Sequence, residues 1–65
     1  MRLLVNGEPR EVEATTLASA LEALDYSEAT IATALNGEFV PERARSATQV
    51  RDGDRIEVLA PRQGG

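Results

Sequence analysis

Gly64 and Gly65, at the end of the chain, are the residues whose types point most directly to a chemistry. Neither has a Cβ atom, so this segment can thread a narrow active-site channel and adopt backbone conformations that other residues resist. The reactive group that such an end presents is its own carboxylate. We therefore expect a carrier protein whose working group is the carboxylate of Gly65 and not a side chain.

A short polar segment, residues 60–65, contains these glycines, and we expect it to be a flexible tail on a single domain formed by residues 1–59. A fully extended segment of this length spans on the order of 20 Å, which would let its end enter a partner's active site. Pro61 cannot donate to a sheet and would stiffen the exit from the preceding strand. Simple terminal disorder is the alternative interpretation. The tail residues that we expect a partner to recognise are Pro61, Arg62, Gln63 and Gly64.

The composition excludes most catalytic machinery. The 65 residues include no cysteine and no histidine, so a thiol nucleophile and an imidazole base are both missing. The same absence excludes disulfides and removes the usual ligands of a structural zinc ion. We interpret the 11 Asp and Glu residues as a solvated surface. We expect the chain not to be an enzyme and to bind no metal or cofactor itself.

The charge balance bears on the kind of partner. The formal net charge is −4, and all 7 basic residues are arginine. A nucleic-acid-binding chain usually shows a basic stripe with interleaved aromatic residues, and this chain has neither. No apolar run approaches the length of a membrane span, and residues 1–6 become polar too soon for a signal peptide. We expect no nucleic-acid partner, no membrane partner and a cytoplasmic location.

Strand patterns recur along the chain and are joined by two hairpin signals. Asn6 and Asn36 are each followed by glycine, and such pairs favour type I′ turns because both residues tolerate positive φ. Pro9 lacks a backbone donor, which places the second strand at an edge of the sheet. The predicted strands cover residues 1–5, about 10–13, 31–35, 38–40 and 55–59.

One helix is predicted, in residues 17–24. Thr15 or Thr16 can cap its N-terminus, and the helix is expected to end at residues 25–27. Residues 42–48 are expected to be polar and irregular, residues 49–51 a turn or a very short strand, and residues 52–54 a turn. The apolar face of the helix, with spacing i, i+3, i+4 and i+7, comprises Leu17, Ala20, Leu21 and Leu24.

This order of elements predicts an α+β fold. One helix covers one face of a small sheet, so the two-layer solution is a mixed sheet of four or five strands with the main helix packed across it. The first and last strands are both apolar and are expected to be central neighbours. That arrangement corresponds to the β-grasp, or ubiquitin-like, fold.

The opposite face of the sheet is a candidate docking surface. Leu59 is out of phase with Ile56 and Val58, and Leu4 is out of phase with its neighbours, so the two leucines would share an exposed face near the root of the tail. Scattered surface leucines or a slipped register would give the same pattern. Phe39 is expected to pack in the core or at the sheet edge, with contact to a partner as the alternative.

Several segments resemble the ThiS family of thiamine-biosynthesis sulfur carriers. Residues 34–41 (ALNGEFVP) and 52–58 (DGDRIEV) are similar to segments of that family, the ending QGG at residues 63–65 is similar to its terminus, and residues 4–9 (LVNGEP) also fit. The likeness covers nearly the whole chain. No single motif is specific, but together, in order and at these spacings, they are fairly specific.

The resemblance implies a mechanism and partners. A ubiquitin-activating-type enzyme would use ATP and Mg²⁺ to adenylate the carboxylate of Gly65. A persulfide, supplied by a donor such as a cysteine desulfurase relay, would then leave a thiocarboxylate on Gly65. Thiazole synthase would take that sulfur. ATP and Mg²⁺ would be used by the activating partner.

Three other functions remain open from the sequence. The small subunit of molybdopterin synthase shares this fold and chemistry, and Pro61 with the two terminal glycines nearly fits its tail pattern. A ubiquitin-like modifier would join target lysines through Gly65. A non-covalent β-grasp binding module would use neither glycine.

Overall fold

The computed structural model describes residues 1–26 and 30–60 of the chain. Five strands form one sheet in the order β2-β1-β5-β3-β4. The strand β1 pairs with β5 in parallel and with β2 antiparallel, while β3 pairs antiparallel with both β4 and β5. The strands are β1 (Arg2–Val5), β2 (Glu8–Glu11), β3 (Ala32–Leu35), β4 (Glu38–Val40) and β5 (Arg55–Leu59).

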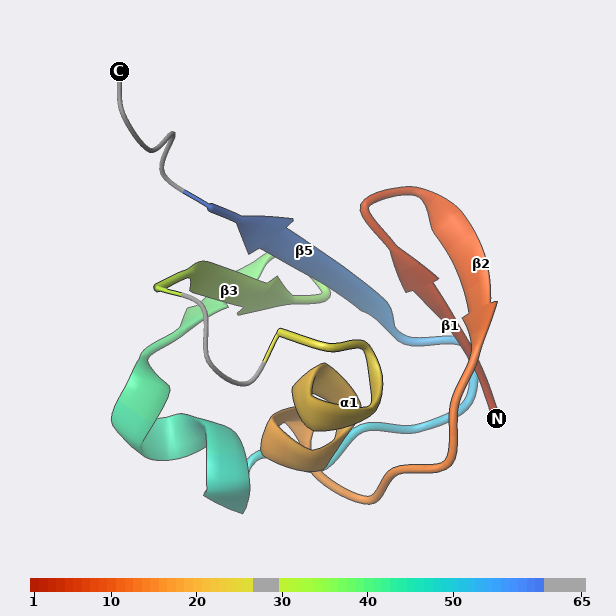
Figure 1. The fold of residues 1–65 in the computed structure, drawn as a ribbon, viewed down its shortest axis with the longest axis horizontal. Coiled ribbons are helices and arrows are strands. Elements are labelled where there is room, and N and C mark those ends of the chain that lie inside the picture. The colour runs from red at the N-terminus through yellow and green to blue at the C-terminus, as the bar shows by residue number, and fades with distance from the viewer. Residues whose placement is uncertain (27–29, 61–65) are drawn as a thin grey trace.

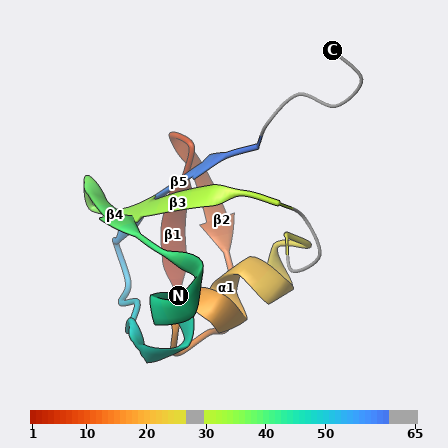
Figure 2. The ribbon, with the colours of Figure 1, turned by 90° about the vertical axis from the view of Figure 1, so that its left-hand side faces the viewer.

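Helix α1 (Leu17–Ala23) lies under one face of this sheet, with a short 3₁₀ helix, η1 (Glu42–Ala47), beside it (Figures 1 and 2). The first and last strands are central neighbours, as the sequence predicted. The α+β prediction of a small mixed sheet with one main helix on one face is therefore confirmed.

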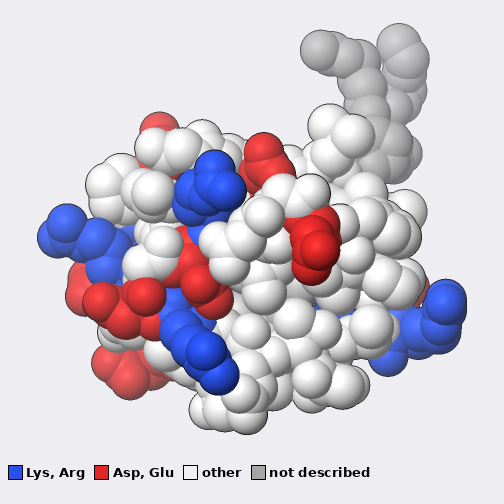
Figure 3. Space-filling model, turned by 180° about the vertical axis from the view of Figure 1, so that it is seen from behind, with Lys and Arg blue, Asp and Glu red and all other residues white. Residues whose placement is uncertain are grey.

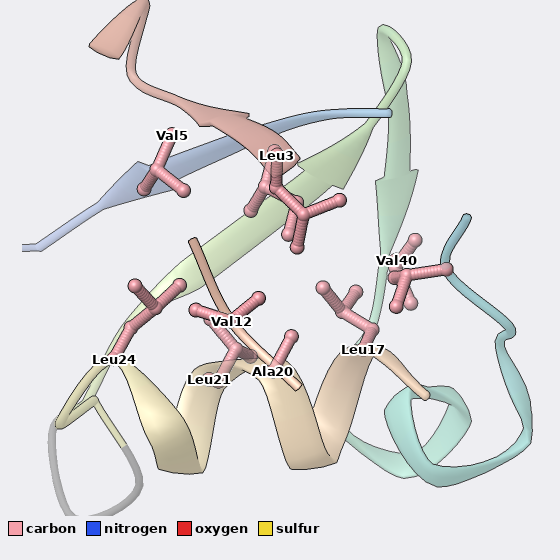
Figure 4. Packing of buried hydrophobic residues seen from close by; sticks show 10 residues of the cluster. Leu3, Val5, Val12, Leu17, Ala20, Leu21, Leu24 and Val40 are labelled. Carbon is pink, nitrogen blue, oxygen red and sulfur yellow. The ribbon is translucent and has the colours of Figure 1, made fainter. Parts of the chain in front are cut away.

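The core lies between α1 and the sheet (Figure 4). Leu17, Leu3 and Ile56 are fully buried there, one from the helix and two from the central strands. Their burial follows from periodicity, because the helix presents every third or fourth residue to the sheet and each strand presents every second residue to the helix. The rest of the core comprises Val5, Val12, Ala20, Leu21, Leu24, Val40 and Val50.

A capping box fixes the start of α1. The backbone nitrogen of Ser19 donates to the Thr16 hydroxyl oxygen at 3.1 Å, and the Thr16 backbone nitrogen donates to the Ser19 hydroxyl oxygen at 3.0 Å. Two amide groups that the first turn leaves without helical partners are satisfied in this way. Of the two threonines proposed as caps, Thr16 is the N-cap.

The second strand starts earlier than predicted. It runs over Glu8–Glu11 instead of beginning at about residue 10. Asn6 and Gly7 have φ values of 51° and 83°, so the chain reverses at once and Glu8 pairs directly with Val5. Pro9 lies opposite Leu4 on this edge strand, in agreement with the prediction.

The segment predicted to be irregular after Pro41 is the 3₁₀ helix η1. Arg45 fastens it to the sheet, because its Nε donates to the Thr33 hydroxyl oxygen at 3.2 Å and its Nη2 donates to the Ile31 carbonyl oxygen at 2.8 Å. In residues 49–51, predicted to be a turn or a very short strand, Gln49 forms an isolated bridge with Thr16.

Candidate functional site

The exposed face of the sheet, on the side away from α1, carries the candidate docking residues. Along β5 the side chains alternate, so Ile56 faces the helix while Glu57 and Leu59 face outward. Leu59 pairs with Ala32, and Phe39 pairs with Ala34 across the next ladder. Residues paired in this way share one face of the sheet. We call Ala32, Ala34, Phe39 and Leu59 the outer patch.

The outer patch is apolar and open to water. Phe39 is 70% exposed and Leu59 is 73% exposed, and these are the large apolar side chains that stay exposed among residues 1–26 and 30–60. Seen from behind, charged side chains lie at both sides and in the upper part of the view, and a stretch of uncharged surface lies between them (Figure 3). A hollow in the surface is lined by the outer patch together with Asn6, Gly7, Thr33, Glu57 and Val58.

The exposure of Phe39 differs from the expected packing in the core. The strand β4 has three residues, and its neighbouring residue Val40 is buried beneath the sheet. Successive side chains of a strand point to opposite faces, so the burial of Val40 turns Phe39 outward. The sequence signal that could have shown this is the alternation within the strand, which puts Phe39 and Val40 on opposite faces and lets only one of them enter the core.

Leu4 shares the outward face but lies apart from Leu59. It is half-buried and pairs with Arg55, four residues before Leu59 on the same strand. At the rise of a β-strand this separation is roughly 13 Å. Arg55 and Glu57 occupy the face between the two leucines. The two residues therefore share a face, as predicted, without forming one continuous apolar contact.

The predicted tail residues lie outside the described part of the chain. These are Pro61, Arg62, Gln63, Gly64 and Gly65. The described residues end at Ala60, directly after β5. The chain therefore leaves the described structure beside Leu59 and the outer patch.

The described residues also bear on metal binding and on membrane spanning. Among residues 1–26 and 30–60, no three or more acidic side chains come together in a group that could hold a metal ion. No helix in this described part of the chain combines the length and the apolar character needed to cross a bilayer.

Known proteins resemble this chain in sequence. The ThiS family matches residues 3–65. The sulfur carrier protein ThiS of Thermus thermophilus is 41% identical over 66 aligned positions, which cover 94% of this chain and 95% of that protein. A thiazole synthase of Paramagnetospirillum magneticum is 35% identical over 66 positions, which cover all of this chain but only 20% of that protein.

The fold has a close counterpart among solved structures. The crystal structure of the thiamine biosynthesis protein ThiS from Geobacter metallireducens superposes with a TM-score of 0.82. The two chains are 38% identical, and the superposition covers the whole of each. Sequence and fold therefore point to the same relatives.

Proposed function

The chain belongs to the ThiS family of sulfur carriers in thiamine biosynthesis, and we propose that the group that carries the sulfur is the carboxylate of Gly65. The observation that supports this choice is that the family match continues through residue 65. The described residues lead to the same segment, because β5 ends at Leu59 and residues 60–65 follow it.

A carboxylate must be activated before sulfur can replace one of its oxygens. Its negative charge repels nucleophiles and its oxygen is a poor leaving group. We propose that an adenylating enzyme of the ubiquitin-activating type joins the Gly65 carboxylate to AMP and releases pyrophosphate from ATP. That enzyme would supply ATP and Mg²⁺, so this chain acts as a substrate and not as a catalyst.

The sulfur then enters by acyl substitution. A persulfide from a donor such as a cysteine desulfurase relay attacks the activated carbonyl carbon, and AMP leaves. A thiol then attacks the sulfur atom bonded to the donor, so the S–S bond of the acyl disulfide breaks. The thiol and the donor form a disulfide, and a thiocarboxylate remains on Gly65. Neither Gly64 nor Gly65 has a Cβ atom, so no side chain from these two residues crowds the carbonyl.

We propose thiazole synthase as the acceptor of the sulfur. Support comes from the thiazole synthase of Paramagnetospirillum magneticum, because one-fifth of that protein matches this entire chain. A carrier-like segment within the length of a thiazole synthase is the arrangement expected if the two proteins act on each other.

The outer patch is proposed to dock the carrier on the adenylating enzyme. Exposed apolar surface on a small protein commonly marks an interface, and Phe39 and Leu59 supply it here. Leu4 lies on the same face and would extend the contact beyond Arg55. Docking at this patch would leave residues 60–65 free to enter the partner's active site.

A genetic rescue tests the role of the two glycines. The chain is expressed in a bacterium that requires thiamine because its own carrier gene is deleted. The full chain should restore growth without thiamine, and the chain lacking Gly64 and Gly65 should not. Growth supported by the shortened chain, at equal protein level, would exclude Gly65 as the carrier of sulfur.

A further inference from the structure

Asn6 completes the hydrogen bonding of β5 at the point where β1 ends. The parallel ladder pairs Val5 with Ile56 and then stops, because the chain turns away at Asn6. The Asn6 backbone nitrogen still donates to the Ile56 carbonyl oxygen at 2.9 Å. The side chain of Asn6 then extends this hydrogen-bonded ladder to the backbone of Val58.

The side-chain amide of Asn6 takes the place of a peptide group. The Val58 backbone nitrogen donates to Asn6 Oδ1 at 2.8 Å, and Asn6 Nδ2 donates to the Val58 carbonyl oxygen at 3.2 Å. A carboxamide offers the same donor and acceptor as a peptide unit, so it can satisfy both groups of Val58 at once. The backbone of Asn6 has φ 51°, in the left-handed region that asparagine tolerates.

Asn36 is a natural control at the other end of the same strand. It occupies the equivalent turn position, with φ 52°, and its backbone nitrogen donates to the Arg55 carbonyl oxygen at 2.8 Å. The Arg55 backbone nitrogen donates to Asn36 Oδ1 at 2.9 Å, and Asn36 Nδ2 donates to Asp54 Oδ1 at 3.1 Å. Asn6 therefore fixes the end of β5 nearer the tail, and Asn36 fixes its start.

We propose that Asn6 is a positioning residue for the acyl transfer at Gly65. It holds Val58 from the side of β1, while β3 holds Leu59 from the other side through its pairing with Ala32. The end of β5 beside the outer patch is therefore fixed on both edges. Because residue 60 and the segment with Gly65 follow β5 directly in the sequence, a fixed end of β5 would favour productive delivery of the Gly65 carboxylate to the partner's active site. This inference rests on the proposed function, because it concerns the delivery of the Gly65 carboxylate.

The anchoring itself can be measured without any partner. Asn6→Gly keeps the left-handed turn and removes the side-chain amide, and Asn36→Gly does the same at the control position. Loss of two hydrogen bonds should accelerate hydrogen exchange at the Val58 amide by about tenfold or more in Asn6→Gly, beyond any change in global stability. In Asn36→Gly, hydrogen exchange should accelerate at the Arg55 amide instead. Equal exchange at Val58 in both variants would overturn the inference.

The positioning role is tested by the rate of sulfur loading. With the adenylating enzyme, ATP and a persulfide source, Asn6→Gly should lower kcat for thiocarboxylate formation by roughly fivefold to tenfold and change KM by less than about twofold. Asn36→Gly should change kcat by less than about twofold.

The possible results separate the two claims. If the wild-type chain is loaded and Asn6→Gly matches Asn36→Gly in kcat, the positioning role is wrong and the proposed function stands. If the wild-type chain is not loaded by an enzyme that loads another carrier, the proposed function is wrong and the positioning role falls with it. A loss of kcat in Asn6→Gly that is absent in Asn36→Gly supports both.

Discussion

Phe39 and Leu59 are the residues whose side chains depart most from the usual placement of apolar groups, since each is more than two-thirds exposed. Replacing either with alanine removes little buried area, so the free energy of unfolding should change by less than about 0.5 kcal/mol. The same replacements should weaken binding to the adenylating enzyme by about tenfold, as expected for exposed apolar residues at the centre of an interface. Isothermal titration calorimetry and urea denaturation measure the two quantities.

Glu38→Ala is the matched control for this prediction. Glu38 is exposed on the same short strand as Phe39, but the alternation of the strand directs it to the other face. Its replacement should leave the affinity within about twofold. If Phe39→Ala and Leu59→Ala bind as tightly as the wild-type chain, the outer patch is not the docking surface.

The helix α1 is the element whose stability depends most clearly on one local motif. Thr16→Ala removes the hydroxyl that accepts from the Ser19 backbone nitrogen and breaks the capping box. The free energy of unfolding should fall by about 1 kcal/mol. Urea denaturation of Thr15→Ala is the control, because Thr15 contributes its carbonyl oxygen, not its side chain, to the bond with Val50. An equal loss in both variants would contradict this account of the cap.

The elements that the sequence predicted well are those determined by local patterns. The apolar spacing from Leu17 to Leu24 was sufficient to predict α1, and each Asn-Gly pair predicted its hairpin. The helix η1 was missed because tertiary contacts hold it. Arg45 reaches Thr33 and the Ile31 carbonyl, which are far from it in sequence. A pattern read along the chain carries no signal for such contacts.

The candidate site was predicted in part for the same reason. The alternation along β5 correctly placed Leu59 outward, and the pairing of β1 with β5 was also predicted. The register of that pairing depends on the turn at Asn6 and on the Asp54 carbonyl, which accepts from the Leu4 backbone nitrogen at 3.0 Å. The sequence could not give this register, so it could not show that Leu4 and Leu59 lie apart.

The whole molecule depends on a small core. Leu17 is fully buried, and Leu17→Ala should lower the free energy of unfolding by about 2–5 kcal/mol. A domain of this size has little stability to spare, so much of the variant should be unfolded at 37 °C. Leu59→Ala removes the same atoms from an exposed site and should remain folded. Thermal unfolding followed by circular dichroism compares them, and similar midpoints would contradict the core described here.

The central claim concerns the end of the chain, and intact-mass spectrometry tests it most directly. The chain is incubated with the adenylating enzyme, ATP and a persulfide source, and its mass is measured before and after. The account predicts a gain equal to the exchange of one oxygen for one sulfur, mapped by fragmentation to Gly65. An unchanged mass, with an enzyme that loads another carrier under the same conditions, would contradict it.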